Sequence, residues 1–449
     1  MDFRTLKLYK IPIIFAVACA AFYLSFAYDL ERTDFIKLTG LYLGLFFLSF
    51  QFIKMQKHNF WVLVALALIY RLLFLFSMPN LSQDFYRFIW DGRLIAEGWN
   101  PFAYIPKELY GNPDFHIPQA TPLLNGMGNL SAGHYSNYPP VSQLIFAIAG
   151  FLFPGNLLGS VMSMRFFLIL ADMGTLFFGA KLLKELKLAE YRIFWYILNP
   201  FVIIELTGNL HFEGLMVFLL VLSLYLLLKK KWFYSAIFFG LAVSVKLLPL
   251  MFLPLFYQYF RKNSSLINLQ LYYLIVGLVV ALTFIPFYSA EVFSNFLQSV
   301  GLWFGKFEFN ASIYYIVRWV GFQIKGYNII ETAGKILPLF TLAFILFLSF
   351  FRKNHTLRQL IENMLFAVTF YLLLSTTVHP WYLAVPLLLS IFSRFRFMIV
   401  WSGAVVLSYF AYSNPTYEEN LWLVALEYLI VFGYLGYEVF HQRKFRLPE

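Results

Sequence analysis

Apolar residues occur in runs of about 20 along almost the whole chain, and short polar or basic segments separate these runs. A helix needs about 20 mostly apolar residues to cross a bilayer. The pattern therefore predicts an all-α, polytopic transmembrane helical bundle of about 12–14 spans, forming a single integral membrane domain over residues 1–449. The expected spans lie near 9–28, 34–53, 59–77, 157–181, 191–207, 213–228, 232–248, 249–260, 266–288, 330–351, 360–378, 380–393, 396–413 and 420–440.

Composition supports a membrane protein and argues against a soluble domain and against a nucleic-acid-binding protein. The chain is 61% hydrophobic and only 13% charged, whereas a soluble domain carries roughly 25% charged residues. The net charge of +11 would suit nucleic acid, but the basic residues lie in short clusters between apolar runs instead of forming one patch. We therefore expect membrane lipids and no nucleic acid as partners. Cys19 is the sole cysteine of the sequence, which excludes an internal disulfide and a cysteine-based zinc or redox site.

The basic clusters also predict an orientation, because cytoplasmic loops carry an excess of Lys and Arg. With both termini in the cytoplasm, clusters such as Lys229–Lys231 and Arg261–Lys262 fall inside. The two long polar segments, 78–140 and 289–329, then form extracytoplasmic loops. We expect the first loop to carry juxtamembrane, interfacial helices and to continue into a re-entrant segment that ends at 153.

The first candidate for chemistry is the polar stretch Ser82–Arg87, which follows the third expected span. Ser82 is suited to cap a helix beginning at Gln83 or Asp84. On such a helix Asp84, Arg87 and Asp91 share one face, and an acid beside a cation at the outer interface suits a general base. The alternative is a surface helix with an ordinary ion pair, which spacing alone favours.

Three further outer motifs carry polar groups. His211 and Glu213 lie in a turn between two expected spans, where either a cavity mouth or a plain polar turn would hold them. Lys246 lies about 22 Å along a helix from the Lys229–Lys231 cluster, so it either meets a phosphate in a wet cavity or extends to the interface. His379 precedes the helix-breaking Pro380. Three roles are open for its side chain at this break: binding a phosphate, orienting a base, or simply lying at the membrane interface.

Three acidic residues raise other possibilities. Asp172 is expected to pair with Arg165, two turns earlier on the same helix. Asp84 and Asp91 would share a divalent metal, Mg or Mn, only across about 10 Å, which is long for a common ion. The sequence therefore leaves a divalent metal open as an alternative and predicts no other cofactor.

In this order along the chain, the outer motifs resemble those of the GT-C superfamily of membrane glycosyltransferases, and in particular its bacterial mannosyltransferase-like branch. The matching segments are Asp84–Arg93, Asn100–Phe102, Tyr138–Pro140, His211–Gly214, Lys246–Pro249 and His379–Tyr382. The resemblance implies a GT-C-like fold in a bacterial inner membrane. It also implies a polyprenyl-phosphate sugar donor, a lipid or glycan acceptor, an extracytoplasmic active site and inversion at the anomeric carbon.

By this resemblance Asp84 is the base that deprotonates the acceptor, and Lys246, with Arg87, Arg93 or His379, stabilises the leaving phosphate. The residues it implies for substrate binding are Arg87, Asp91, Arg93, His211, Glu213, Lys246, His379 and Tyr382. Many members of the superfamily carry the catalytic acid after their first span. Here it follows the third, so we interpret the first two spans as an N-terminal addition.

Two other functions remain open from the sequence. A transporter or flippase of lipid-linked saccharides would place polar residues through the full membrane depth, and the inner halves of the spans are poor in them. A membrane ligase or polymerase of cell-surface glycans would share the donor chemistry and differ in its acceptor.

Overall fold

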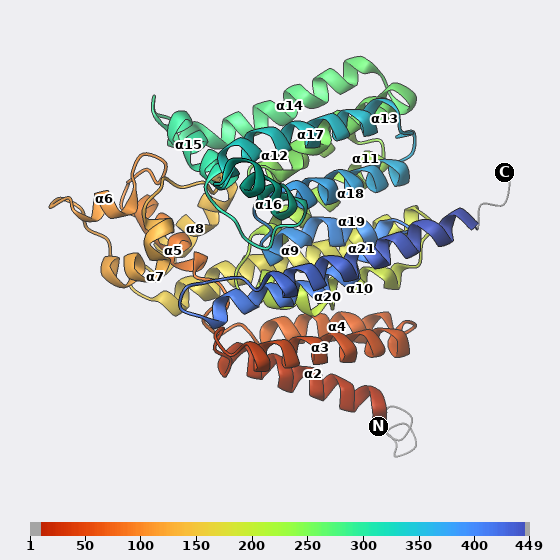
Figure 1. Cartoon of the computed structure of the whole chain (residues 1–449), viewed down its shortest axis with the longest axis horizontal. Coiled ribbons are helices and arrows are strands. Elements are labelled where there is room, and N and C mark those ends of the chain that lie inside the picture. The colour runs from red at the N-terminus through yellow and green to blue at the C-terminus, as the bar shows by residue number, and fades with distance from the viewer. Residues whose placement is uncertain (1–9, 445–449) are drawn as a thin grey trace.

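The computed structural model describes residues 10–444, with side chains described throughout except at 303–305 and 441–444. Within that range the secondary structure is helical apart from one isolated bridge between Phe309 and Thr377, which confirms the predicted all-α class. Long helices lie side by side in one bundle, and a smaller group of helices projects from one end of it (Figure 1). The outermost parts of the expected cytoplasmic termini, 1–9 and 445–449, lie outside the described residues.

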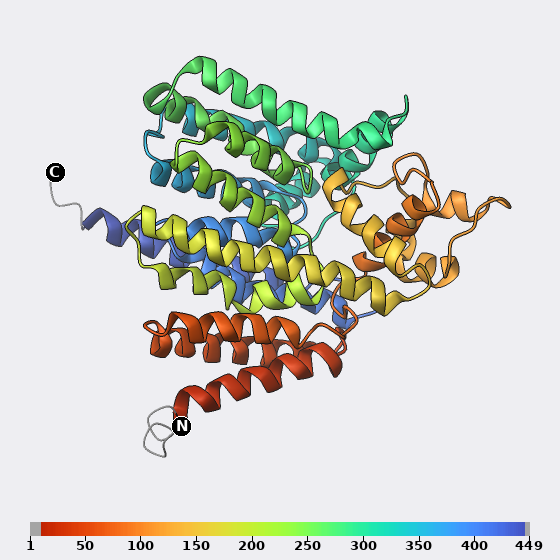
Figure 2. The same cartoon turned by 180° about the vertical axis from the view of Figure 1, so that it is seen from behind.

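Three N-terminal helices form one flank of the bundle, drawn in red in Figures 1 and 2. Asp34 starts the second of them by accepting a hydrogen bond from the backbone of Lys37 at 3.0 Å. Their outer faces expose large apolar side chains, including Ile36 (85% exposed) and Trp61 (79% exposed), as expected for a lipid-facing surface. These helices are α2 (Lys10–Tyr28), α3 (Phe35–Gln56) and α4 (Phe60–Leu72).

The remaining bundle mixes long helices with broken ones. Its elements are α9 (Leu157–Glu185), η1 (Glu190–Ile193), α10 (Phe194–Ile197), η2 (Val202–Gly208), α11 (Glu213–Leu228), α12 (Trp232–Val243), η3 (Leu248–Leu255), α13 (Phe256–Asn263), α14 (Leu266–Phe284), η4 (Ile285–Phe287), α17 (Ile330–Phe350), α18 (Leu357–Leu374), η5 (Pro380–Leu383), α19 (Ala384–Phe392), α20 (Phe397–Ala404), η6 (Val405–Ser413) and α21 (Leu421–Lys444).

Fewer continuous helices cross the full membrane thickness than the expected 12–14. In the described part of the chain seven helices are long and apolar enough, or eight if η2 and α11, bent by 109°, count as one span. The other expected spans appear as shorter apolar helices or as several pieces. Proline accounts for part of this, because Pro249, Pro254 and Pro380 each lack the backbone N–H that a continuous helix uses.

Two buried charged residues of the bundle, Asp172 and Arg165, have polar partners that differ from those the sequence predicted. Asp172 accepts from Arg71 of α4 at 2.7 Å, so the expected pair with Arg165 is wrong. Arg165 instead donates to the carbonyl oxygens of Thr207 and Gly208 at 2.9 and 2.7 Å. Those carbonyls lie at the end of η2, where the helix stops and leaves acceptors without helical partners.

The helices that project from the bundle end are called the cap here, and comprise α5 (Asp84–Ala96), α6 (Pro106–Tyr110), α7 (Ala120–Ala132) and α8 (Pro140–Leu152). The second long polar segment contributes α15 (Val292–Gly305) and α16 (Ile313–Lys325). Phe102 of the cap packs between α14 and α15 against Phe284 and Phe296. Both expected polar segments therefore fold into helices at the same end of the bundle (Figure 2).

Within the cap, α5 and α8 cross at very short distance. A Cβ atom added at Gly92 would lie 2.0 Å from the carbonyl oxygen of Phe146, and one at Gly150 would lie 2.4 Å from that of Gly92. Only glycine allows the two backbones to approach this closely. The crossing fixes the direction of α5 and so the position of its first residue, Asp84.

Candidate functional site

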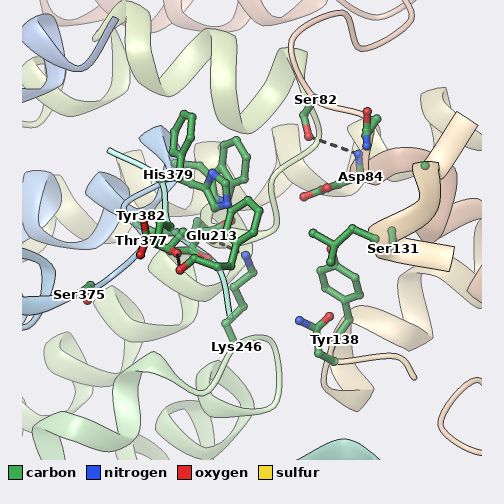
Figure 3. Close-up of a pocket in the computed structure, with 18 of the residues that line it drawn as sticks. Ser82, Asp84, Ser131, Tyr138, Glu213, Lys246, Ser375, Thr377, His379 and Tyr382 are labelled. Atoms are coloured by element: carbon green, nitrogen blue, oxygen red, sulfur yellow. Dashed lines mark hydrogen bonds and ion pairs between the residues drawn. The ribbon is translucent and has the colours of Figure 1, made fainter. Parts of the chain in front are cut away.

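A cavity of about 850 Å³ lies where the cap meets the bundle. Its walls come from segments far apart in the sequence: the start of α5, the region from α7 to α8, the start of α11, the turn after α12, and the turn between α18 and η5. Figure 3 shows the polar side chains of these segments converging on one space. A volume of this size is typical of small-molecule sites.

Five of the nine predicted site residues line this cavity, namely Asp84, Glu213, Lys246, His379 and Tyr382. Asp84 is the first residue of α5, and Glu213 is the first residue of α11. Lys246 follows the end of α12, where the chain turns toward η3. The fold thus brings together groups that the sequence could only place on one side of the membrane.

Asp84 presents its carboxylate to the cavity. The hydroxyl of Ser82 accepts from the backbone N–H of Asp84 at 3.3 Å, but Gln83 occupies the N-cap position and makes no side-chain capping bond, so the predicted capping role of Ser82 is wrong. Among the described residues, none donates a hydrogen bond to the Asp84 carboxylate. Burial raises the pKa of Asp84 to about 6, Lys246 opposes this rise and Glu213 adds to it. The carboxylate is therefore ionised and free to accept a proton above pH 6.

Lys246 and Glu213 form an ion pair in the wall opposite Asp84 (Figure 3). Glu213 is 3% exposed and Lys246 is 24% exposed, so the ammonium group is the member that reaches the cavity. The ammonium nitrogen also lies 5.9 Å from the centre of the Tyr382 ring. The second carboxylate oxygen of Glu213 accepts no hydrogen bond from the described residues. The ion pair therefore holds a cation at the cavity surface.

His379 belongs to a stack of rings. Its ring lies 4.5 Å from that of Trp381, which stacks in turn on His211 at 3.7 Å. Burial, with a smaller contribution from Lys246, lowers the pKa of His379 to about 3. His379 is thus neutral near pH 7, so it supplies a hydrogen-bonding ring to the cavity and no positive charge.

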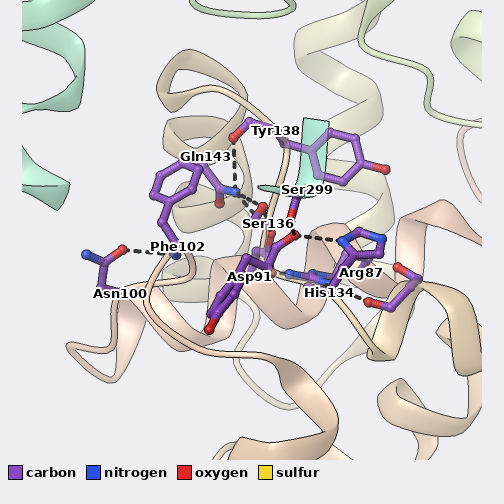
Figure 4. Close-up of polar contacts among 11 residues, drawn as sticks. Arg87, Asp91, Asn100, Phe102, His134, Ser136, Tyr138, Gln143 and Ser299 are labelled. Atoms are coloured by element: carbon purple, nitrogen blue, oxygen red, sulfur yellow. Dashed lines mark hydrogen bonds and ion pairs between the residues drawn. The ribbon is translucent and has the colours of Figure 1, made fainter. Parts of the chain in front are cut away.

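Arg87 and Asp91 do not line the cavity, although they share a helix face as predicted. Arg87 donates to Asp91 at 2.8 Å and to the carbonyl oxygens of Ser131 and His134 at 2.5 and 3.0 Å. Asp91 also accepts from Ser136 at 2.5 Å and from Gln143 at 3.0 Å (Figure 4). Both side chains are almost fully buried. This network connects α5 to α7, α8 and the segment between them. Neither Arg87 nor Asp91 is therefore placed to contact a substrate in the cavity.

Arg93 and His211 also lie away from the cavity wall. Arg93 donates to the carbonyl oxygen of Pro118 and to the side chain of Gln119, at 2.5 and 3.0 Å, within the cap. His211 is 1% exposed and is covered by Trp381. Arg93 thus connects parts of the cap to each other, and His211 supports the ring of Trp381.

Sequence reasoning missed several residues of the cavity, and Arg32 is the most informative of them. Its guanidinium lies 5.0 Å from the centre of the Tyr412 ring and donates to the hydroxyl of Tyr417 at 3.3 Å. Arg32 forms no ion pair with any described residue. Because it lies between α2 and α3, the N-terminal helices contribute to the site and are more than an addition to it.

The residues that the structure describes do not converge into a metal site. Within the described part of the chain no group of three or more His, Cys, Asp or Glu side chains converges as metal ligands would. Asp91, the partner that a metal shared with Asp84 would need, is held by Arg87, Ser136 and Gln143.

One protein-family model matches more than half of the chain. Residues 19–260 match a family model described as alpha-(1->6)-mannopyranosyltransferase, N-terminal domain. This range includes Asp84, Glu213 and Lys246, whereas His379 and Tyr382 lie beyond it.

Two curated proteins show detectable similarity. The chain is 29% identical over 147 residues, 32% of its length, to alpha-(1->6)-mannopyranosyltransferase B of Corynebacterium glutamicum, and covers 23% of that protein. It is 24% identical over 275 residues, 60% of its length, to alpha-(1->6)-mannopyranosyltransferase A of Mycobacterium tuberculosis, and covers 50% of it. The matches thus span half or less of each relative. The family model covers more than half of this chain and confirms the predicted resemblance, and we conclude that this integral membrane protein belongs to the alpha-(1->6)-mannopyranosyltransferase family.

Proposed function

We propose that the protein transfers a mannosyl residue from a polyprenyl-phosphate donor to a hydroxyl group of a lipid or glycan acceptor. The observation that carries this proposal is the free carboxylate of Asp84 facing the Lys246 cation across one cavity. Transfer from a phosphate-linked sugar needs a base for the incoming hydroxyl and a cation for the outgoing phosphate. The names of the two relatives support mannose as the sugar.

Asp84 acts as the general base in this mechanism. Its carboxylate takes the proton of the acceptor hydroxyl while that oxygen forms a bond to the anomeric carbon. The bond between the anomeric carbon and the phosphate oxygen breaks, and the electron pair leaves with polyprenyl phosphate. Attack from the face opposite the leaving group inverts the anomeric configuration. The proton resides on Asp84 until it passes to solvent.

Lys246 stabilises the charge that develops on the departing phosphate. Glu213 holds the ammonium group in place at the cavity surface. Arg32 is a second cation of the same cavity without a carboxylate partner among the described residues, so we assign it to the donor phosphate as well. The neutral rings of His379 and Tyr382 lie beside Lys246 and serve to position the sugar.

We place this site on the extracytoplasmic side. The cap and the cavity lie at one end of the bundle, and the connections from α9 to η1, α11 to α12 and α17 to α18 lie at the other (Figures 1 and 2). These connections carry the basic clusters Lys181–Lys187, Lys229–Lys231 and Arg352–Lys353. The excess of Lys and Arg on cytoplasmic loops supports this orientation in a bacterial inner membrane.

The proposal is tested with purified protein and a panel of polyprenyl-phosphate sugars that differ only in the sugar. We expect release of polyprenyl phosphate from the mannose donor in the presence of an acceptor, with inverted configuration in the product. Equal panels of nucleotide sugars serve as the control donors. Sugar transfer from a nucleotide donor, with no release from any polyprenyl-phosphate sugar, would show that the donor class is wrong.

A further inference from the structure

A second cavity, of about 580 Å³, lies at the end of the bundle opposite the cap. We call it the basal pocket, and it is formed where α13 packs against the end of α17 and the turn that leads to α18. Four cations line it: Arg261 and Lys262 from α13, and Arg352 and Lys353 from the turn. None of the residues assigned to sugar transfer contributes to it.

The described residues place no carboxylate in an ion pair with the cations of the basal pocket. Among the described residues, none of the four cations forms an ion pair. The carboxylate on the adjacent α18, Glu362, lies 3.7 Å from Arg358 and 3.8 Å from Arg394 and so belongs to other partners. Four like charges around one hollow repel one another, and an anion from outside the chain would relieve that repulsion.

The turn that carries Arg352 and Lys353 is held rigidly against α13. Gln258 donates to the carbonyl oxygen of Ser349 at 2.7 Å and accepts from the backbone of Asn354 at 3.2 Å. Asn263 donates to the carbonyl oxygen of His355 at 2.8 Å. These bonds on both sides of the cationic pair keep it facing Arg261 and Lys262. The hydrogen bonds therefore fix the backbone of the turn beside α13, and the four exposed cationic side chains extend from these two elements.

Polar and apolar surfaces meet at the edge of the pocket. Phe350 and Phe351 line it and are 56% and 79% exposed. The outward face of the neighbouring α17 continues with Leu339, Phe340 and Phe347, each about half exposed or more. A ligand that fits both surfaces has an anionic head and apolar chains.

We propose that the basal pocket binds an anionic phospholipid, with the headgroup phosphate among the four cations and the acyl chains along the exposed face of α17. Basic pockets between helices at the cytoplasmic side of a membrane suit anionic headgroups in this manner. The proposal is independent of the glycosyltransferase reaction, because the site lies at the other end of the molecule.

Native mass spectrometry of the full chain tests the proposal, with phosphatidylglycerol as the probe and phosphatidylethanolamine as the zwitterionic comparison. The test variant is R261Q/K262Q/R352Q/K353Q. The control variant, K54Q/K57Q/K230Q/K231Q, removes the same charge from exposed lysines of other expected inside clusters. We expect the fraction of protein carrying phosphatidylglycerol to fall about tenfold or more in the test variant and to stay near the wild-type value in the control.

A milder double variant, R352Q/K353Q, keeps the experiment decisive if the fourfold variant does not fold, and we expect a loss of about threefold to tenfold. Equal loss in test and control variants would overturn the proposal, because it would reduce the effect to net charge. Full displacement of the lipid by soluble glycerophosphoglycerol at the same concentration would also overturn it, because the acyl chains would then contribute nothing.

Discussion

Asp84 faces two charges of opposite sign that belong to one ion pair. Lys246 favours the ionised carboxylate and Glu213 disfavours it, while burial raises the pKa to about 6. A base with a pKa just below the working pH is ionised and still accepts a proton readily. The Lys246–Glu213 pair thus has two effects, because it presents a cation to the phosphate and sets the proton affinity of the base.

The rate of sugar transfer should therefore depend on pH through Asp84. Because the base must be ionised, kcat/KM is expected to be constant above about pH 7 and to fall tenfold per pH unit well below 6. The measurement is a pH–rate profile with the polyprenyl-phosphate donor. The variant E213Q removes one negative charge and frees Lys246, and both changes lower the pKa of Asp84. Its acidic limb should move to lower pH, and a shift to higher pH would contradict the assignment.

The buried pair of Arg87 and Asp91 should matter for stability. Substitution D91A leaves the Arg87 charge buried without its carboxylate, which typically costs about 3–5 kcal/mol, so the thermal unfolding midpoint should fall markedly. The pair Glu331 and Lys335 has the same helical spacing but is exposed, so E331A is the matched control and should leave the midpoint unchanged. A similar, small change in both variants would show that the network does not hold the cap together.

Residue types and the charge pattern of the loops placed Asp84, Glu213, Lys246 and His379 on one side of the membrane, and the family resemblance added Tyr382 and implied a common site. Helical spacing also placed Arg87 and Asp91 on one helix face, but could not show which segment packs on that face. Arg32 was missed because a single Arg in a short polar turn carries no local signal. Its significance comes from Tyr412 and Tyr417, nearly 400 residues later in the sequence.

At the scale of elements, the close crossing of α5 and α8 determines where Asp84 lies. We expect G150A to destabilise the protein by about 1–3 kcal/mol, because the added methyl group meets the backbone of α5. The readout is the thermal unfolding midpoint together with kcat/KM, and both should fall. Substitution G40A, in a helix where a Cβ would meet nothing within 4 Å, is the control and should be neutral or stabilising. Identical behaviour of the two variants would argue against the crossing as a constraint.

The connection between α2 and α3 should contribute to donor binding through Arg32. Loss of a charge-assisted hydrogen bond to phosphate costs about 1.5–3 kcal/mol, so R32Q should raise KM for the donor by about 10-fold to 100-fold. The acceptor KM should change little, and R32K should retain part of the effect. If R32Q has the same donor KM as the wild type, then Arg32 and the N-terminal helices do not contribute to donor binding.

The lengths of apolar runs predicted which segments are helical, and each of the expected spans coincides with one or more helices. The positions of the breaks were harder to predict. Residues 191–207 read as one apolar run, yet they fold as three short elements that carry carbonyls for Arg165. Such breaks are stabilised by distant side chains, and the local sequence does not encode them.

At the scale of the whole molecule, the two ends of the bundle carry different sets of polar residues. The cap encloses a cavity that combines a free acid, a cation and neutral rings, and the opposite end carries unbalanced basic residues. Within the bundle, Arg71 and Asp172 form a buried ion pair with each other. This distribution favours chemistry at one membrane face and lipid contact at the other.

The central claim, that Asp84 is the base for mannosyl transfer from a polyprenyl-phosphate donor, is tested most directly by the substitution D84N. The measurement is release of polyprenyl phosphate from the mannose donor by protein whose unfolding midpoint matches the wild type. The control D114N makes the same chemical change at an exposed position of the cap. We predict a loss of about 10²–10⁴ in kcat for D84N and none for D114N. Wild-type turnover in folded D84N would contradict the account.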